Sequence, residues 1–113
     1  MTKDYYAQKL SAGRLERVYE LAGTRVRRYL QAEIDHLAGM IKPGGRILEV
    51  GCGYGRALAP LAQISGFGWG VDNAFENLLM AARKYPRLRL ALMDAGCLGF
   101  YDQSFDIVFG IQN

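Results

Sequence analysis

Hydrophobic positions in the first forty residues recur at the three- and four-residue spacing of amphipathic helices. Leu15, Val18, Tyr19 and Ala22 form one such series. After a Gly-Thr pair the same spacing resumes over residues 26–41. The pattern therefore predicts two N-terminal helices, which together make a helical segment over residues 1–42.

The second of these helices carries signals at both ends. Thr24 is a residue type that caps helix N-termini, because its hydroxyl can accept a hydrogen bond from a free backbone amide. Residues 42–45 read Lys-Pro-Gly-Gly, a combination that ends helices. We therefore expect the helix to begin after Thr24 and to stop before Pro43.

From residue 43 onward short apolar runs alternate with helical stretches, which is typical of βαβ units. Asn73 is placed to cap a helix predicted at residues 74–84. Pro60 lies inside a helix predicted at residues 54–64, where it either kinks the helix or marks a late start. The strands are predicted at residues 46–50, 66–71, 88–93 and 105–109, and the helices at residues 54–64 and 74–84. Right-handed crossovers then give a three-layer α/β, Rossmann-like parallel sheet with helices on both faces, truncated after about four strands.

A glycine-rich turn lies where the first predicted strand meets the following helix. Gly51, Gly53 and Gly55 allow a ligand to approach the backbone, and the amides of a helix start face it, so a nucleotide site is expected. A phosphate-binding loop would need Gly-Lys-Ser or Gly-Lys-Thr, which this turn lacks. A dinucleotide fingerprint would need a third glycine where Arg56 stands.

Glu49 stands two residues before the first glycine of the turn, and its charge disfavours ligands that carry phosphate at this position. A carboxylate there repels a pyrophosphate, but it suits a cofactor that carries a sulfonium and an ammonium group and no phosphate. Residues 47–55, Ile-Leu-Glu-Val-Gly-Cys-Gly-Tyr-Gly, closely resemble motif I of the class I S-adenosylmethionine-dependent methyltransferases. Three later segments are also similar to the family: Gly-Val-Asp at residues 70–72, Met-Asp-Ala at 93–95, and the run 98–108.

The resemblance implies S-adenosylmethionine as the cofactor and S-adenosylhomocysteine as its product. It implies that the turn approaches the methionine portion, with Glu49 supporting that end, while Asp72 binds the ribose hydroxyls and Asp94 with Ala95 reads the adenine. Taken singly, Asp72 could instead cap the next helix, Asp94 could be a turn residue, and Cys52 could be a small filler. The expected cofactor-binding residues are Glu49, Gly51, Cys52, Gly53, Gly55, Asp72, Asn73, Asp94 and Ala95.

The resemblance covers residues 25–113, with residues 43–113 forming an S-adenosylmethionine-binding half-domain. The family's fifth strand and its substrate loops have no counterpart here, so neither a catalytic base nor the acceptor can be assigned. We expect methyl transfer to a small molecule, with this chain supplying the cofactor-binding half. The alternatives are an inactive cofactor-binding or assembly fragment and, less favoured, an NAD-binding domain.

Composition and charge indicate where the protein is located and which partners it has. Half of the 113 residues are hydrophobic, yet no apolar run is long enough to cross a membrane, so a cytoplasmic protein without a membrane partner is expected. The two cysteines and single histidine do not suggest a metal site. The net charge of +3 arises in residues 1–45, where we expect a solvated helical face in preference to a nucleic-acid site. The fourth strand would be a sheet edge, which predicts self-association or continuation into a longer chain.

Overall fold

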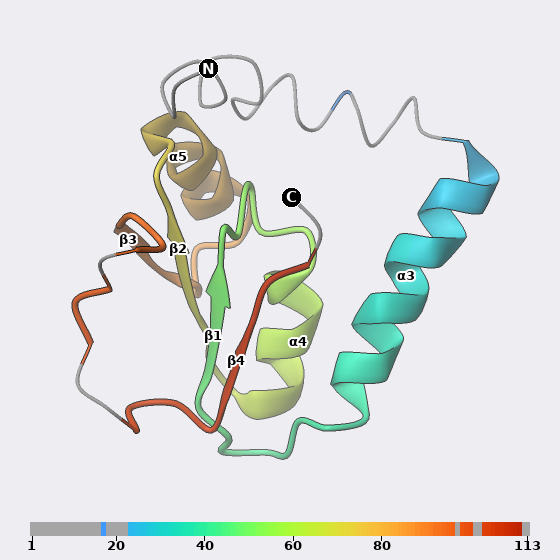
Figure 1. Cartoon of the computed structure of the whole chain (residues 1–113), viewed down its shortest axis with the longest axis horizontal. Coiled ribbons are helices and arrows are strands. Elements are labelled where there is room, and N and C mark those ends of the chain that lie inside the picture. The colour runs from blue at the N-terminus through green and yellow to red at the C-terminus, as the bar shows by residue number, and fades with distance from the viewer. Residues whose placement is uncertain (1–16, 18–22, 97, 101–102, 112–113) are drawn as a thin grey trace.

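The computed structural model describes residues 17, 23–96, 98–100 and 103–111 of the chain. The expected helix over residues 15–22 thus lies almost wholly outside the described residues. Within them, a long helix precedes a regular alternation of strands and helices (Figure 1). In chain order the elements are α3 (Thr24–Ala38), β1 (Ile47–Val50), α4 (Leu58–Ser65), β2 (Trp69–Asp72), α5 (Phe75–Lys84), β3 (Arg89–Leu92) and β4 (Ile107–Phe109).

The four strands form one parallel sheet in the order β3-β2-β1-β4. The first strand is therefore central, as right-handed crossovers require. Leu48 pairs with Trp69 on one side and with Val108 on the other, which fixes the register across the middle of the sheet. The predicted Rossmann-like parallel sheet is confirmed. Helices on both faces are not found in the described part of the chain, because α3, α4 and α5 all contribute to one core cluster with Ile47.

The main hydrophobic core lies between the sheet and the three helices. Ile47 of β1 is fully buried there against Leu58 and Leu61 of α4, and α3 contributes Leu30 and Ile34 to the same cluster. Leu78 brings α5 into this cluster as well. The helices seen beside the sheet in Figure 1 thus share a single core with it.

Side chains alternate along a strand, so Leu48, Trp69 and Val108 point to the opposite face of the sheet from Ile47. An aromatic cluster covers part of this face. The Trp69 ring meets Phe100 edge-on with centroids 5.5 Å apart, and Phe100 meets Phe105 in the same way at 4.9 Å. The connection between β3 and β4 therefore takes the covering role on this side, and it is the orange-to-red loop of Figure 1.

Helix α4 begins four residues later than the sequence pattern predicts. Residues 54–57 belong to the turn because Gly55 has a left-handed φ of 94°, which a helix cannot contain. Pro60 then falls in the first turn of α4, where its missing N–H has no intrahelical partner to lose. Pro60 was predicted either to kink the helix or to mark a late helix start, and the structure shows the late start.

The other helix ends also differ from expectation. Gly23 is the N-cap of α3 and Thr24 is already helical, and the helix ends at Ala38 with Gly39 as its C-cap. Residues 42–45 therefore follow the helix end and do not cause it. Helix α5 has Ala74 as its N-cap, so the prediction that Asn73 caps it is wrong.

Candidate functional site

The glycine turn lies at the C-terminal end of the central strand β1. Gly51, Gly53 and Gly55 all have positive φ values, of 74°, 58° and 94°, which only glycine adopts without strain. The amides of Gly51 and Cys52 both donate to the carbonyl oxygen of Val71, at 2.8 and 3.0 Å. The turn is thus folded back onto β2, so that the ends of β1 and β2 meet.

Asp72 ends β2 directly beside this turn, and its carboxylate is buried, with 8% of the residue exposed. One oxygen, Oδ2, accepts a hydrogen bond from the amide of Gly53 at 2.8 Å. The other, Oδ1, accepts from the amide of Ala74 at 2.8 Å, at the start of α5. Asp72 therefore joins the turn to the segment that leads into α5. Its contact with Ala74 is a turn contact and not a helix cap, because α5 has no side-chain capping hydrogen bond.

Glu49 is buried on β1 with 2% of its surface exposed, and its Oε1 atom has no hydrogen-bond partner. Burial raises the pKa of Glu49 from 4.5 to about 8, the backbone amide of Ile111 lowers it, and the negative charge of Asp72 raises it further. At neutral pH this carboxyl group is mostly protonated. A cation placed beside Glu49 would favour ionisation of its carboxyl group and would interact with the unpaired Oε1 atom.

Two close approaches hold the turn in place, and the sequence interpretation missed both. A Cβ atom on Gly70 would lie 2.7 Å from Leu58 Cδ2 and 2.8 Å from Cys52 Sγ, so only glycine lets α4 and the turn pack on β2. A Cβ on Gly55 would lie 3.0 Å from Tyr85 Cδ2. Burial also raises the pKa of the Cys52 thiol, which therefore stays uncharged and fills space.

Asp94 and Ala95 follow β3, which is the neighbour of β2 in the sheet. The amide of Met93 donates to the backbone oxygen of Asp72 at 3.1 Å, so the two strand ends lie together. Asp94 Oδ1 accepts a hydrogen bond from the amide of Gly96 at 2.9 Å, which is a turn contact. Ala95 is exposed, and so is Asn73, which follows Asp72.

Asn77 is a second residue that the sequence interpretation did not single out. It lies in the first turn of α5, is 5% exposed, and its Nδ2 atom is 3.4 Å from Asp72 Oδ1. Its own Oδ1 atom is buried and has no hydrogen-bond partner. An asparagine five residues after an acidic strand end could have been noticed in the sequence, but nothing there indicates its burial.

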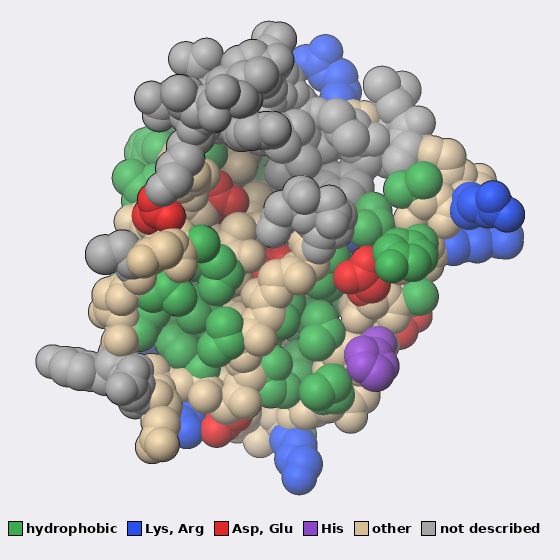
Figure 2. Space-filling model, in the orientation of Figure 1, with side chains coloured by type: hydrophobic (Ala, Val, Ile, Leu, Met, Phe, Trp, Pro, Cys, Tyr) green, Lys and Arg blue, Asp and Glu red, His purple; other side chains and the backbone are tan. Residues whose placement is uncertain are grey.

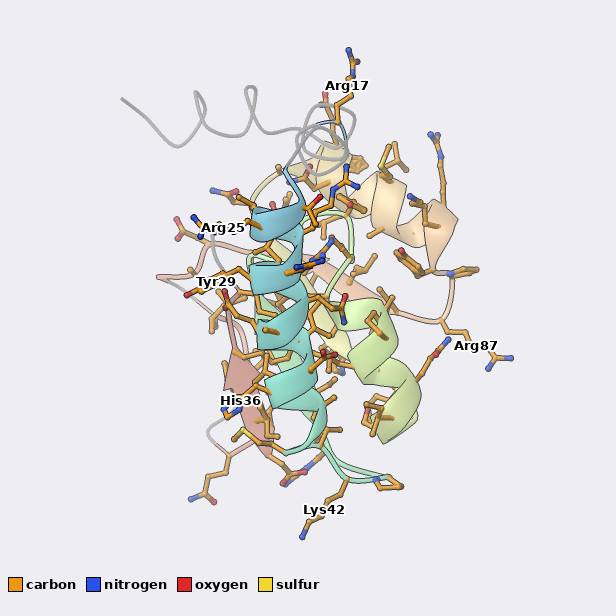
Figure 3. The ribbon with its side chains drawn as sticks, turned by 90° about the vertical axis from the view of Figure 1, so that its right-hand side faces the viewer. Arg17, Arg25, Tyr29, His36, Lys42 and Arg87 are labelled. Carbon is orange, nitrogen blue, oxygen red and sulfur yellow. The ribbon has the colours of Figure 1, made fainter. Side chains whose placement is uncertain are left out.

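Outside this site the polar groups are dispersed. His36, the single histidine of the chain, is exposed and projects from α3 on the same side as Arg25 and Tyr29 (Figure 3). Among the described residues, no group of three or more His, Cys, Asp or Glu could hold a metal ion. In the same part of the chain, no helix has the length and apolar character needed to span a membrane.

The comparisons with known proteins agree with this geometry. Residues 47–113 match the family described as "Methyltransferase domain", so the match begins at β1 and includes the glycine turn, Asp72 and Asp94. The chain belongs to the class I S-adenosylmethionine-dependent methyltransferases. The resemblance seen in motif I and in the three later segments is thereby confirmed.

Individual methyltransferases show how much of the family domain is present. The chain is 30% identical over 96 residues to the 2-methyl-6-phytyl-1,4-hydroquinone methyltransferase of Synechocystis sp., covering 74% of this chain and 30% of that protein. It spans about a third of the length of the curated relatives that it matches.

Two solved structures extend the comparison. SAM-bound CalS10, an amino pentose methyltransferase from Micromonospora echinaspora, is 26% identical with a TM-score of 0.64, covering 74% of this chain and 36% of that one. Magnesium protoporphyrin IX methyltransferase from Synechocystis PCC 6803 with bound SAM is 20% identical with a TM-score of 0.76, covering 96% and 60%. The second likeness concerns the fold alone.

Proposed function

We propose that this chain binds S-adenosylmethionine at the joined ends of β1, β2 and β3, and that it supplies the cofactor-binding part of a small-molecule methyltransferase. The observation that supports this most directly is the contact between Asp72 and the turn. The amide nitrogen of Gly53 donates to Asp72 Oδ2 at 2.8 Å, so the turn and the carboxylate lie in one site at the C-terminal edge of a parallel sheet. This edge is where Rossmann-like folds bind nucleotides.

The charges at this edge fit a cation better than a phosphate. Burial is the main reason that the pKa of Glu49 is raised, and the negative charge of Asp72 nearby raises it further. An ammonium group beside Glu49 would relieve this repulsion and pair with the free Oε1 atom. A pyrophosphate there would add negative charge to two carboxyl groups, which disfavours an NAD-binding domain.

The remaining roles follow the order of the strands. Asp72 Oδ1 accepts from Ala74 and Asn77, whereas Oδ2 accepts from Gly53 alone and keeps a lone pair, so Oδ2 can also accept from a ribose hydroxyl. Asp94 and Ala95, at the end of the next strand, would hold the adenine, with Asn73 bordering the ribose. When bound, S-adenosylmethionine supplies an activated methyl group, and these residues orient it while the buried turn excludes water.

A small-molecule acceptor is supported by two of the similar methyltransferases, which act on a hydroquinone and on an amino pentose. We assign no general base among the described residues. An inactive cofactor-binding fragment remains the second candidate. Binding of S-adenosylhomocysteine by this chain without methyl transfer would favour it.

The exposed edge of β4 is the proposed site of self-association. Among the described strands β4 pairs only with β1, and Val108 is 56% exposed on it. Tyr29 and Val26 of α3 are also exposed, at 68% and 51%, and Figure 2 shows hydrophobic side chains over the sheet as well as along α3 on the same face. An unpaired apolar edge of this kind favours pairing with another strand.

The proposed role of Glu49 can be tested by following protons during binding. At pH 7 an ammonium-bearing ligand should displace the proton of Glu49, so titration with S-adenosylhomocysteine should release close to one proton per site. Calorimetry in phosphate and in Tris buffer measures this release, because the two buffers take up protons with different heats. The Glu49→Gln variant should bind more weakly and release none. Binding by the unmodified chain with equal heats in both buffers would contradict the role of Glu49.

A further inference from the structure

Two buried side-chain atoms in the described residues lack a hydrogen-bond partner, and both belong to residues that interact with Asp72. One is Glu49 Oε1, whose proposed partner is the cofactor's ammonium group. The other is Asn77 Oδ1 in α5, to which the proposed function assigns no role. A buried amide with an unmet acceptor destabilises a fold, so its presence at this position needs an explanation.

The orientation of the Asn77 amide follows from its neighbour. An ionised carboxylate accepts hydrogen bonds and donates none, so the Nδ2 group of Asn77 must face Asp72 Oδ1, and it lies 3.4 Å away. The carbonyl oxygen then points away from Asp72 and is left unpaired in a site with 5% exposure. The contact with Asp72 thus leaves Asn77 Oδ1 without a hydrogen-bond partner.

The contact also completes a set of donors around one carboxylate. Asp72 Oδ2 accepts from Gly53, while Asp72 Oδ1 accepts from Ala74 at 2.8 Å and from Asn77. The first two donors are backbone amides fixed by the turn and by the start of α5. Asn77 adds a side-chain donor from one turn further along α5. The backbone amide of Asn77 donates to the carbonyl oxygen of Ala74 at 3.1 Å. The carboxylate is therefore held from three directions.

We propose that Asn77 is a positioning residue for the cofactor, holding the Asp72 carboxylate in the orientation that ribose binding requires while leaving its own carbonyl oxygen unpaired. This inference rests on the proposed function. Leucine has nearly the same shape as asparagine and has no polar atoms, so it would satisfy the core of α5 better. Asn77→Leu should therefore have opposite effects on stability and on cofactor binding.

The test compares thermal unfolding of the ligand-free chain with calorimetric titration of S-adenosylhomocysteine and of 5'-methylthioadenosine, which lacks the amino acid end. Asn77→Leu should raise the melting temperature by about 2 to 5 °C, since the unpaired buried atom is removed. It should weaken both ligands by about tenfold and by the same factor, because the contact concerns the ribose. The matched control is Gln31→Leu, which removes another side-chain amide, bonded to Asp35 at 3.0 Å on exposed α3, and should leave both affinities unchanged.

Three results would overturn the proposal. One is an Asn77→Leu chain that binds both ligands as tightly as the unmodified chain. Another is a variant that loses stability and affinity together, which would make Asn77 an ordinary structural residue. If that variant does not fold, Asn77→Ser takes its place, and unchanged affinity for 5'-methylthioadenosine would then refute the positioning role. Absence of binding by the unmodified chain would instead refute the proposed function.

Discussion

The carboxylate of Asp72 accepts a hydrogen bond from the backbone amide of Gly53 at 2.8 Å, across 19 residues of sequence. This contact joins the end of β2 to the glycine turn that follows β1. Since the glycines have left-handed backbones, the amide can be directed at the carboxylate without strain. The proposed cofactor site therefore depends on an acid and a turn that hold each other in place.

Replacing Asp72 by asparagine should damage both the fold and the site. The amide has one acceptor and one donor end, so either Gly53 or Ala74 would face an N–H group in place of an oxygen. We expect a loss of about 1 to 3 kcal/mol in the free energy of unfolding, measured by urea denaturation, together with a loss of S-adenosylhomocysteine binding.

The same substitution at Asp106 is the control for this experiment. Asp106 accepts from the backbone amide and the guanidinium of Arg46, at 2.8 and 2.9 Å, at the opposite end of the sheet, and the Arg46 hydrogen bonds lower its pKa. Asp106→Asn should leave ligand affinity intact, because this pair ties β4 to β1 far from the turn. Equal losses of binding in the two variants would show that the effect is not local to the site.

Gly70 should tolerate no side chain. The Cβ atom of Gly70→Ala would lie 2.7 Å from Leu58 Cδ2 and 2.8 Å from Cys52 Sγ, so α4 and the turn would have to move off β2. We expect a destabilisation of about 1 to 3 kcal/mol, together with weaker cofactor binding.

Gly39 offers an opposite control for the change at Gly70. Its φ and ψ of −68° and −15° suit alanine, and a Cβ there would meet only the carbonyl oxygen of His36 at an ordinary 3.6 Å. Gly39→Ala should therefore stabilise the chain by about 0.4 to 1 kcal/mol. A harmless Gly70→Ala substitution in the same denaturation series would show that the packing of the turn on β2 is not tight.

Glu49 should make the chain less stable as the pH rises. Its pKa is about 8 in the folded chain against 4.5 ordinarily, so between these values the folded state binds more protons than the unfolded state. The free energy of unfolding should fall with increasing pH across this window, by at most about 1.4 kcal/mol per pH unit. Urea titrations at pH 5, 6, 7 and 8 measure the slope. Glu49→Gln should flatten it, and a slope that survives this substitution would have to come from another group.

The edge of β4 should govern association of the chain. Val108 is exposed beside the unpaired edge, so a lysine there would oppose pairing by charge repulsion between copies. Light scattering on a size-exclusion column should show concentration-dependent oligomers for the unmodified chain and a shift to monomer for Val108→Lys. Replacing exposed Gln63 on α4 by lysine adds the same charge away from the edge and should not shift the distribution. A monodisperse monomer at every concentration would contradict self-association.

The sequence predicted the strands well because their apolar runs are short and bounded by glycine or charged residues. The family resemblance also assigned Glu49, the turn and Asp72 to one cofactor site, and the structure brings them to the same edge of the parallel sheet. Helix starts were less predictable, because the start of α4 depends on the left-handed φ of Gly55 and that of α5 on the Asp72 contact with Ala74. Asn77 was missed because its burial and its unpaired oxygen arise only from three-dimensional packing.

The roles assigned to Asp94, Ala95 and Asn73 stay predictions. Asp94 makes a turn contact with Gly96, which is compatible with holding a base and equally with a turn alone. An Asp94→Ala variant should keep its fold, because this contact is exposed, and should bind S-adenosylhomocysteine about tenfold more weakly if the adenine is read here. Unchanged affinity in calorimetry would place the adenine elsewhere.

The identity of the ligand is the central claim, and one calorimetric comparison tests it most directly. The unmodified chain is titrated at pH 7 with S-adenosylhomocysteine and, separately, with NAD. The acidic pair Glu49 and Asp72 beside a glycine turn without a phosphate-binding pattern predicts saturable heat with S-adenosylhomocysteine and none with NAD. Heat with NAD alone would contradict the account.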